Sequence, residues 1–344
     1  MGIRQHFLRQ AEACDNLGSP FTARLCRLLP SLLDQTAEVG GIVTGWGGDA
    51  GADALALRLC GGLHALVLSS RAPRLTAAYP PNTASDKELA RAVVAATLEQ
   101  ADFLVEFLKR PPQTNEIGRS AMLLPGLLAI GRETAMPIQL CEIGASAGLN
   151  LMLDRFHYRY GEACWGDEAA PVRLAPEIRG KGPPLGGFLD ISDRQGCDTS
   201  PIDIADAEER LRLKSYIWAD QTERLERLEA ALALAAKDPP PVETADAADF
   251  VEKVLARRNP SSAFVLFHSI MWQYVPEATQ RRIENRLDTA GNLPGAAPIA
   301  WLRMEPVASG APYATLRLNL WPGGATRDLA HCNYHGRWIE WIER

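Results

Sequence analysis

The chain has 344 residues, of which 47% are hydrophobic and 23% charged, a composition typical of a soluble globular protein with one large or two smaller domains. Its formal net charge of -6, with neither half of the chain basic, argues against nucleic acid as the main partner. Seven scattered cysteines without a Cys-x-x-Cys pair favour neither a disulfide framework nor a cysteine zinc site, so we expect a reducing, cytoplasmic location.

The first 135 residues are predicted to be helical. Their start lacks the apolar core of a signal peptide, and the longest apolar run, 121–130, is too short to span a bilayer, so we expect no membrane insertion. Apolar residues recur at spacings of three and four in segments 3–14, 21–33, 52–68, 86–108 and 116–130. Glycine and proline turns separate these segments, and Ser85 and Thr114 are candidate N-caps. We predict a helical N-terminal cap domain over residues 1–135.

Residues 136–344 show a different pattern, in which short apolar runs alternate with helices, and this pattern is typical of a mainly parallel sheet. The predicted strands are 138–143, 187–197, 242–245, 263–267, 299–304, 314–320 and 337–342. The predicted helices are 149–155, 206–236, 247–257 and 277–290. Residues 156–186 are predicted to form an inserted loop or hairpin. No helix separates the last strands, so we expect the sheet to end in an antiparallel hairpin.

The stretch from Leu140 to Leu153 is a predicted strand that passes through a glycine turn into a helix. It matches two incompatible motifs. A Gly-x-Ser-x-Gly elbow would make Ser146 a nucleophile and would need a later acid and a histidine such as His335. However, that fold places several strands and an oxyanion loop before the serine, and here the preceding segments are helical. We therefore favour a nucleotide loop, in which Glu142 precedes Gly144 and Gly148.

A nucleotide loop uses glycine where the backbone approaches the ligand, with the next helix beginning against the ligand's polar atoms. Polar residues also end the later strands. Asp198, with Asp203 as a substitute, could accept hydrogen bonds from ribose hydroxyls, and Asp246 could meet an adenine amine or simply cap the following helix. His268 ends the fourth strand. Because parallel strands end at one edge of a sheet, the sequence predicts a ligand site there.

These motifs carry a resemblance to known families. Glu142-x-Gly-x-x-x-Gly148, Gly196-Cys-Asp-x-Ser-Pro201, Asp246-Ala247 and His268-Ser269 resemble the successive motifs of class I S-adenosylmethionine-dependent methyltransferases. The whole chain also resembles a bacterial family of uncharacterised proteins with a helical region before a methyltransferase-like domain, through segments 113–119, 141–151, 218–224 and 335–341.

The resemblance implies a Rossmann-like α/β fold over residues 136–344 and S-adenosylmethionine as cofactor. The residues implied to hold the cofactor are Glu142, Gly144, Ser146, Gly148, Asn150, Asp198, Asp246 and Ala247. Ser146 stands where methyltransferases of this class usually have a glycine, so the loop is expected to sit differently against the ligand or to add a hydroxyl hydrogen bond.

The candidate catalytic residues on the substrate side are His268, Tyr274 and Asp220. Each also has an ordinary structural interpretation: a satisfied buried histidine, a core aromatic residue and a solvated helical face. The pair Glu116 and Arg119 at a helix start could line a polar cleft or form an intrahelical pair. His331 and His335 have no obvious third ligand, so no metal site is predicted.

The sequence therefore predicts an S-adenosylmethionine-dependent methyltransferase whose acceptor is a small molecule or a protein side chain. Two alternatives stay open. One is a non-catalytic nucleoside-binding protein of the same fold, and the other is a hydrolase that uses Ser146. No nucleic acid or membrane partner is expected, and the sequence leaves the oligomeric state open.

Overall fold

The computed structural model describes residues 2–308 and 310–343, which form two compact units. The helical unit comprises Met1–Thr114 and Ala205–Glu226, and the sheet unit comprises Asn115–Ile204 and Arg227–Arg344. This division differs from the predicted boundary after residue 135. The helix before the first strand packs on the sheet, whereas the segment from Ala205 returns to the helical unit.

The helical unit is built around one helix that is buried on nearly all sides. This helix, α4 (Leu55–Leu68), contacts α1 (Ile3–Asn16), α2 (Pro20–Leu28) and α7 (Ala101–Leu108). The remaining elements are η1 (Leu29–Ser31), η2 (Leu33–Gln35), α3 (Ala37–Thr44), α5 (Pro73–Thr76), α6 (Asp86–Glu99) and α9 (Ala207–Ser215). A helix with apolar residues on nearly every side must be buried, which explains its central place, and its two polar side chains, Arg58 and His64, are buried with it.

Two predicted long helices are each divided into two. Segment 86–108 forms α6 and α7, which separate at Gln100, and α6 begins with a complete capping box formed by Ser85 and Glu88. Segment 206–236 forms α9 and α10 (Thr222–Ala235). In the turn between these two helices the Asp220 carboxylate accepts hydrogen bonds from Ser19 Oγ at 2.5 Å and from Phe21 N at 2.8 Å.

The sheet unit contains a nine-stranded sheet with the order β5-β12-β11-β10-β9-β8-β1-β6-β7. The strands are β1 (Ile138–Ile143), β5 (Glu177–Ile178), β6 (Ile191–Asp198), β7 (Val242–Thr244), β8 (Ala263–Ser269), β9 (Ile299–Pro306), β10 (Ala314–Trp321), β11 (Thr326–Cys332) and β12 (Trp338–Trp341). The five strands from β7 to β9 in this order are parallel, and β9 to β12 are antiparallel. The sheet is mostly parallel and its C-terminal strands are antiparallel, as the sequence predicts, but at that edge the short β5 pairs in parallel with β12.

The strand β11 was not predicted. Its first three residues are polar and its buried positions are few, so no apolar run marks it in the sequence. The inserted segment forms a small sheet of β2 (His157–Tyr160), β3 (Ala163–Trp165) and β4 (Arg173–Leu174), while β5 pairs with β12 at an edge of the large sheet.

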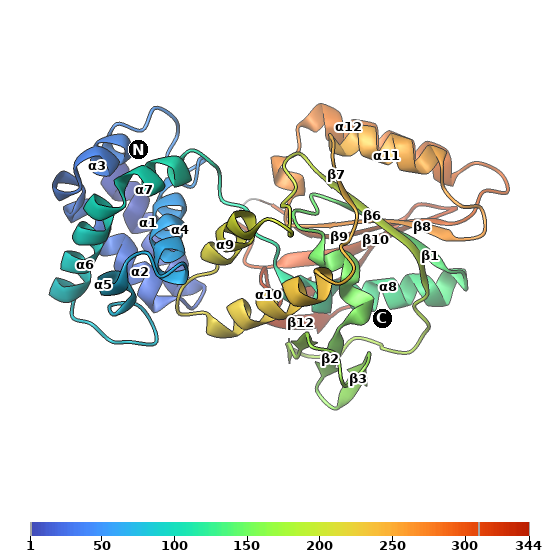
Figure 1. Ribbon diagram of the computed structural model, residues 1–344. Coiled ribbons are helices and arrows are strands. Elements are labelled where there is room, and N and C mark those ends of the chain that lie inside the picture. The colour runs from blue at the N-terminus through green and yellow to red at the C-terminus, as the bar shows by residue number, and fades with distance from the viewer. Residues whose placement is uncertain (1, 309, 344) are drawn as a thin grey trace. The chain divides into compact units, whose positions relative to one another are not determined.

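Helices cover both faces of the large sheet (Figure 1). On one face lies α8 (Ser120–Thr134), and on the other lie α11 (Ala247–Ala256) and α12 (Glu277–Gly291). Cys141 and Ile143 of β1 belong to the apolar core under α11 and α12. Because side chains alternate along a strand, Glu142 faces the side of α8.

No helix within residues 2–308 and 310–343 is both long and apolar enough to cross a membrane.

We expect Leu266→Ala to lower the free energy of unfolding of the sheet unit by about 2 to 5 kcal/mol, because Leu266 is fully buried in the core between β8 and the helices α11 and α12. Urea unfolding monitored by tryptophan fluorescence measures the change. Leu293, 52% exposed, supplies the matched control. Its substitution by alanine should change stability by less than about 0.5 kcal/mol.

Candidate functional site

The order of the parallel strands reverses between β1 and β8. From β1 the chain adds β6 and β7 on one side, and it then adds β8 and β9 on the other. Open α/β sheets bind ligands at such a point, outside the carboxyl ends of the strands, because the following loops run in opposite directions. The loops after β1 and β8 are therefore the candidate site.

The glycine loop after β1, residues 144–148, has an unusual backbone. Gly144, Ser146 and Gly148 have φ values of +66°, +54° and +70°. A Cβ at position 148 would lie 2.6 Å from Val242 Cγ2, so only glycine fits this position without movement of its neighbours. Residues Leu149–Arg155 then form the 3₁₀ helix η4, where a helix was predicted.

Ser146 adopts the left-handed conformation without being glycine, which costs energy. Its hydroxyl is buried and has no hydrogen-bond partner. A serine nucleophile needs a base within hydrogen-bond reach, and no histidine is placed there. His335, which the hydrolase interpretation would use, instead lies with Nδ1 3.4 Å from Glu116 Oε2.

Asp198, at the end of β6, ties the glycine loop to that strand. Its carboxylate accepts hydrogen bonds from Ser146 N and Ser200 N, each at 2.9 Å. The carboxylate is only half-buried, and two carboxylate oxygens offer about four acceptor positions, so it retains capacity for a ligand.

The sequence allows two roles for Asp246, contact with an adenine and capping of the following helix, and the structure shows the capping role. Asp246 is the N-cap of α11, where its carboxylate accepts hydrogen bonds from Ala248 N at 2.9 Å and Asp249 N at 3.3 Å. Ala247 is the first residue of the same helix. The adenine contact of both residues stays a prediction.

The side chain of Asn150 connects η4 to α8 and is not exposed for contact with a ligand. Its Oδ1 accepts a hydrogen bond from Ser120 Oγ at 2.7 Å, and its side chain is buried. Nearby, Asn115 Oδ1 accepts a hydrogen bond from Leu149 N at 2.8 Å. Two buried amide side chains thus fix the first turn after the glycine loop.

Glu142 is the second-last residue of β1 and is only 2% exposed, and its Oε2 has no hydrogen-bond partner. Burial raises the pKa of this carboxyl well above its ordinary value, the positive charge of Arg119 opposes that rise, and Asp198 adds to it. A buried carboxyl without a partner at a strand's carboxyl end is typical of a functional site.

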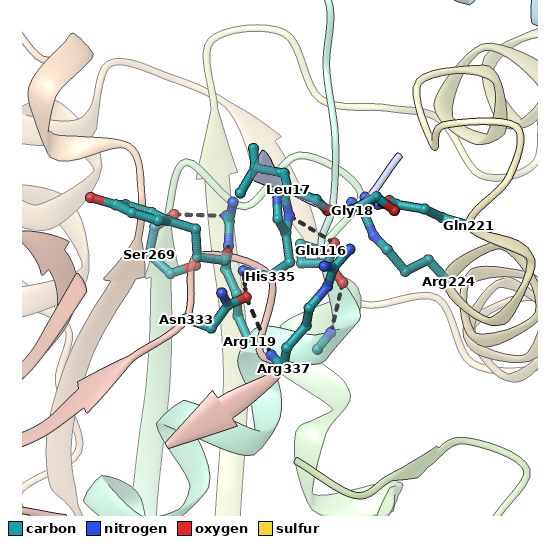
Figure 2. Close-up of polar contacts among 12 residues, drawn as sticks. Leu17, Gly18, Glu116, Arg119, Gln221, Arg224, Ser269, Asn333, His335 and Arg337 are labelled. Carbon is teal, nitrogen blue, oxygen red and sulfur yellow. Dashed lines mark hydrogen bonds and ion pairs between the residues drawn. The ribbon is translucent and has the colours of Figure 1, made fainter. Parts of the chain in front are cut away.

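Arg119 connects the loops at this edge. Its guanidinium donates hydrogen bonds from Nη1 to the carbonyl of Ser269 at 3.1 Å and from Nε to the carbonyl of Tyr334 at 3.0 Å. Figure 2 shows Arg119 beside Ser269 and near Glu116 and His335. A Cβ on Gly336 would overlap the carbonyl of Gly118, so the two turns touch through their backbones.

His268 is the second-last residue of β8 and faces the opposite side of the sheet from Glu142. It lies two residues after Leu266, which belongs to the core under α11 and α12, and alternation places both on that face. Its Nδ1 lies 2.7 Å from Glu305 Oε1 on β9. Sequence reasoning missed Glu305, although an acid that directly follows the apolar run of residues 299–304 is the signal that could have found it.

The other two candidate catalytic residues do not join these groups. Tyr274, in the 3₁₀ helix η5 (Trp272–Tyr274), is 78% exposed. Asp220 belongs to the helical unit, where its carboxylate holds the start of α2. Their roles stay predictions. Within the described part of the chain, no three His, Cys, Asp or Glu side chains are grouped so as to hold a metal ion.

These features define a mixed α/β protein with a large, mostly parallel sheet and a candidate ligand site at its carboxyl edge. The chain belongs to the bacterial family described as "Uncharacterized protein conserved in bacteria (DUF2332)", whose family model matches residues 4–341. Comparisons with curated proteins and with solved structures found no match.

Gly148→Ala should destabilise the sheet unit by about 2 kcal/mol or more, because it adds a left-handed alanine and a clash with Val242. Gly161→Ala is the control, since Gly161 has φ +63° with no atom near its missing Cβ, and its cost should be about 1 to 2 kcal/mol. Urea unfolding compares the two. Equal losses of stability in the two variants would show that Val242 moves away from the added methyl group without strain.

Glu142→Gln should stabilise the sheet unit, and the gain should be larger at pH 8 than at pH 5. The pKa of Glu142 is raised in the folded state, so the folded protein binds the proton more tightly than the unfolded chain. Its stability therefore falls as the pH rises above the unfolded value of about 4.3, and glutamine removes that loss.

Urea unfolding at the two pH values tests this expectation, with Glu277→Gln on the exposed start of α12 as a control whose effect should not change. A loss of stability at pH 8 in Glu142→Gln would instead show that Arg119 stabilises the carboxylate more than burial destabilises it.

Proposed function

We propose that this protein is an S-adenosylmethionine-dependent methyltransferase that acts on a small molecule or a protein side chain. The observation that carries the proposal is the buried, unpartnered carboxyl of Glu142 directly before a left-handed glycine loop at the strand-order reversal. The order β7-β6-β1-β8-β9 also corresponds to the 3-2-1-4-5 order of doubly wound, Rossmann-like sheets.

The residues at this edge fit such a cofactor. Its ammonium group and ribose hydroxyls need hydrogen-bond acceptors, and Glu142 and Asp198 supply carboxylate oxygens with unused capacity. The unpartnered hydroxyl of Ser146 can donate to a ligand carboxylate or accept from a ribose hydroxyl. Gly144 and Gly148 allow the left-handed backbone of this loop, with Met271 and Val242 packed against them.

When bound, the cofactor supplies an electrophilic methyl group. Glu142 and Ser146 would hold its methionine part, Asp198 its ribose, and Asp246 with Ala247 its adenine. Met271 lies against Gly144, where its side chain would exclude water from the reacting groups. The contribution of the protein to the rate would then be mainly orientation of the acceptor and exclusion of solvent.

S-adenosylhomocysteine should bind the whole protein in titration calorimetry. Asp198→Ala should weaken that binding about tenfold or more, since a hydrogen bond to a charged group contributes about 1.5 to 3 kcal/mol. Asp193→Ala on the exposed part of β6 is the matched control and should bind normally. If neither S-adenosylmethionine nor S-adenosylhomocysteine binds while the protein is folded, the proposal fails.

One observation at Ser146 supports a second candidate function, a serine hydrolase. Its hydroxyl is unpartnered and its backbone is left-handed, as in a nucleophile elbow. A fluorophosphonate probe separates the hydrolase from the methyltransferase. We expect no labelling, because no base activates the serine. Labelling that Ser146→Ala abolishes would replace the methyltransferase assignment with a hydrolase.

A further inference from the structure

The second polar group at the carboxyl edge is a buried pair, His268 and Glu305, which the cofactor site does not use. Three groups converge on Glu305 Oε1. His268 Nδ1 lies 2.7 Å away, Met271 N lies 3.0 Å away and Trp272 N lies 3.3 Å away. Two of these are backbone N–H groups, which can only donate, so Oε1 acts as an acceptor.

This arrangement decides which nitrogen of His268 carries the proton. An acceptor oxygen at 2.7 Å requires Nδ1 to be the donor, and in a neutral imidazole the other nitrogen then has a free lone pair. Nε2 is therefore the acceptor of the ring. A carboxylate that fixes a histidine tautomer in this way also stabilises the imidazolium when Nε2 takes a proton.

Nε2 itself is buried and has no hydrogen-bond partner, and the whole His268 side chain is 0% exposed. The Trp272 ring stacks on the imidazole with 4.9 Å between centroids, and Trp301 lies 5.8 Å away. Arg303 covers Trp301 at 3.8 Å. Nε2 is therefore an acceptor beside aromatic rings with no protein donor in reach, and a ligand with an O–H or N–H group can supply the missing donor.

The segment 270–272 joins this pair to the glycine loop. Met271 donates its N–H to Glu305, while a Cβ on Gly144 would lie 2.9 Å from Met271 Cγ. Ile270 is left-handed at φ +54°, an outlier for a β-branched residue, and such strain concentrates at binding and catalytic sites. One short segment thus contacts the proposed cofactor loop and the histidine.

We propose that His268 Nε2 accepts the proton of the methyl acceptor, with Glu305 as the positioning residue, and that the acceptor is therefore a compound with a nucleophilic O–H or N–H group. The acceptor's lone pair forms the bond to the methyl carbon as the carbon–sulfur bond breaks and its electron pair returns to sulfur. The O–H or N–H proton moves to Nε2, and Glu305 balances the imidazolium charge. This substrate class rests on the proposed function, whereas the proton-accepting pair does not.

Imidazole ¹⁵N NMR of the whole protein tests the pair directly. We expect His268, assigned by the loss of its signals in His268→Gln, to carry its proton on Nδ1. Glu305→Gln keeps an acceptor oxygen and should keep this tautomer, while Glu305→Ala should move a large part of the population to the other tautomer. His331, which pairs with Glu340, is the internal control and should not change. A proton on Nε2 in the wild type would overturn the proposal.

Phenol and its methyl ether, anisole, test the ligand class, because they share a shape and differ in the O–H donor. Phenol should shift the His268 Nε2 resonance, anisole should not, and His331 should respond to neither. Equal shifts with both probes, or no shift with either, would overturn the proposal. Thermal unfolding confirms that each variant is folded before its spectrum is interpreted.

The two hypotheses fail separately. If S-adenosylhomocysteine does not bind but phenol shifts Nε2 in the Nδ1-protonated tautomer, the methyltransferase assignment is wrong and the proton-accepting pair stands. If the cofactor binds but His268 carries its proton on Nε2, the proton-accepting pair is wrong and the methyltransferase assignment stands.

Discussion

The parallel pairing of β1 with β6 on one side and β8 on the other is the constraint on which the site depends. All six residues of β1 are buried, so the strand can lie only in the middle of the sheet. Parallel register then brings the ends of three strands to one edge, with Glu142 opposite Phe267 and Ile143 opposite Cys197. Glu142, Asp198 and His268 lie at the carboxyl ends of these three strands, and Ser146 lies in the loop that follows β1.

Strand alternation divides the polar groups of this edge between two faces. Glu142 faces the side of α8, where the charge of Arg119 opposes the rise of its pKa, and His268 faces the side of α11 and α12, where Glu305 fixes its ring. The loop after β8 bridges the faces, because Met271 contacts Gly144 with its side chain and Glu305 with its backbone. Two chemically different groups, a buried carboxyl and an oriented imidazole, therefore lie at one edge without neutralising each other.

Several features of this edge reduce stability. Glu142 Oε2, Ser146 Oγ and His268 Nε2 are buried polar atoms without partners, and Ser146 and Ile270 have left-handed backbones. Each carries a cost that ordinary packing would avoid. Their concentration where the strand order reverses is what a binding or catalytic site requires, since a ligand can supply the missing partners. The apolar core beneath, including fully buried Phe264 and Leu266, offsets that cost.

The sequence by itself determined the local elements: the bounds of β1, the glycine turn that follows it, the change from helical segments to alternating strands and helices, and the antiparallel pairing of the C-terminal strands. These follow from spacing and turn chemistry, which act over a few residues. Only the tertiary structure decided that residues 115–135 belong to the sheet unit, that Asp220 holds α2, that Asp246 caps α11 and that Glu305 pairs with His268. Hydrogen-bond partners far apart in the chain are set by how the strands are ordered and in register, and no local pattern records that order.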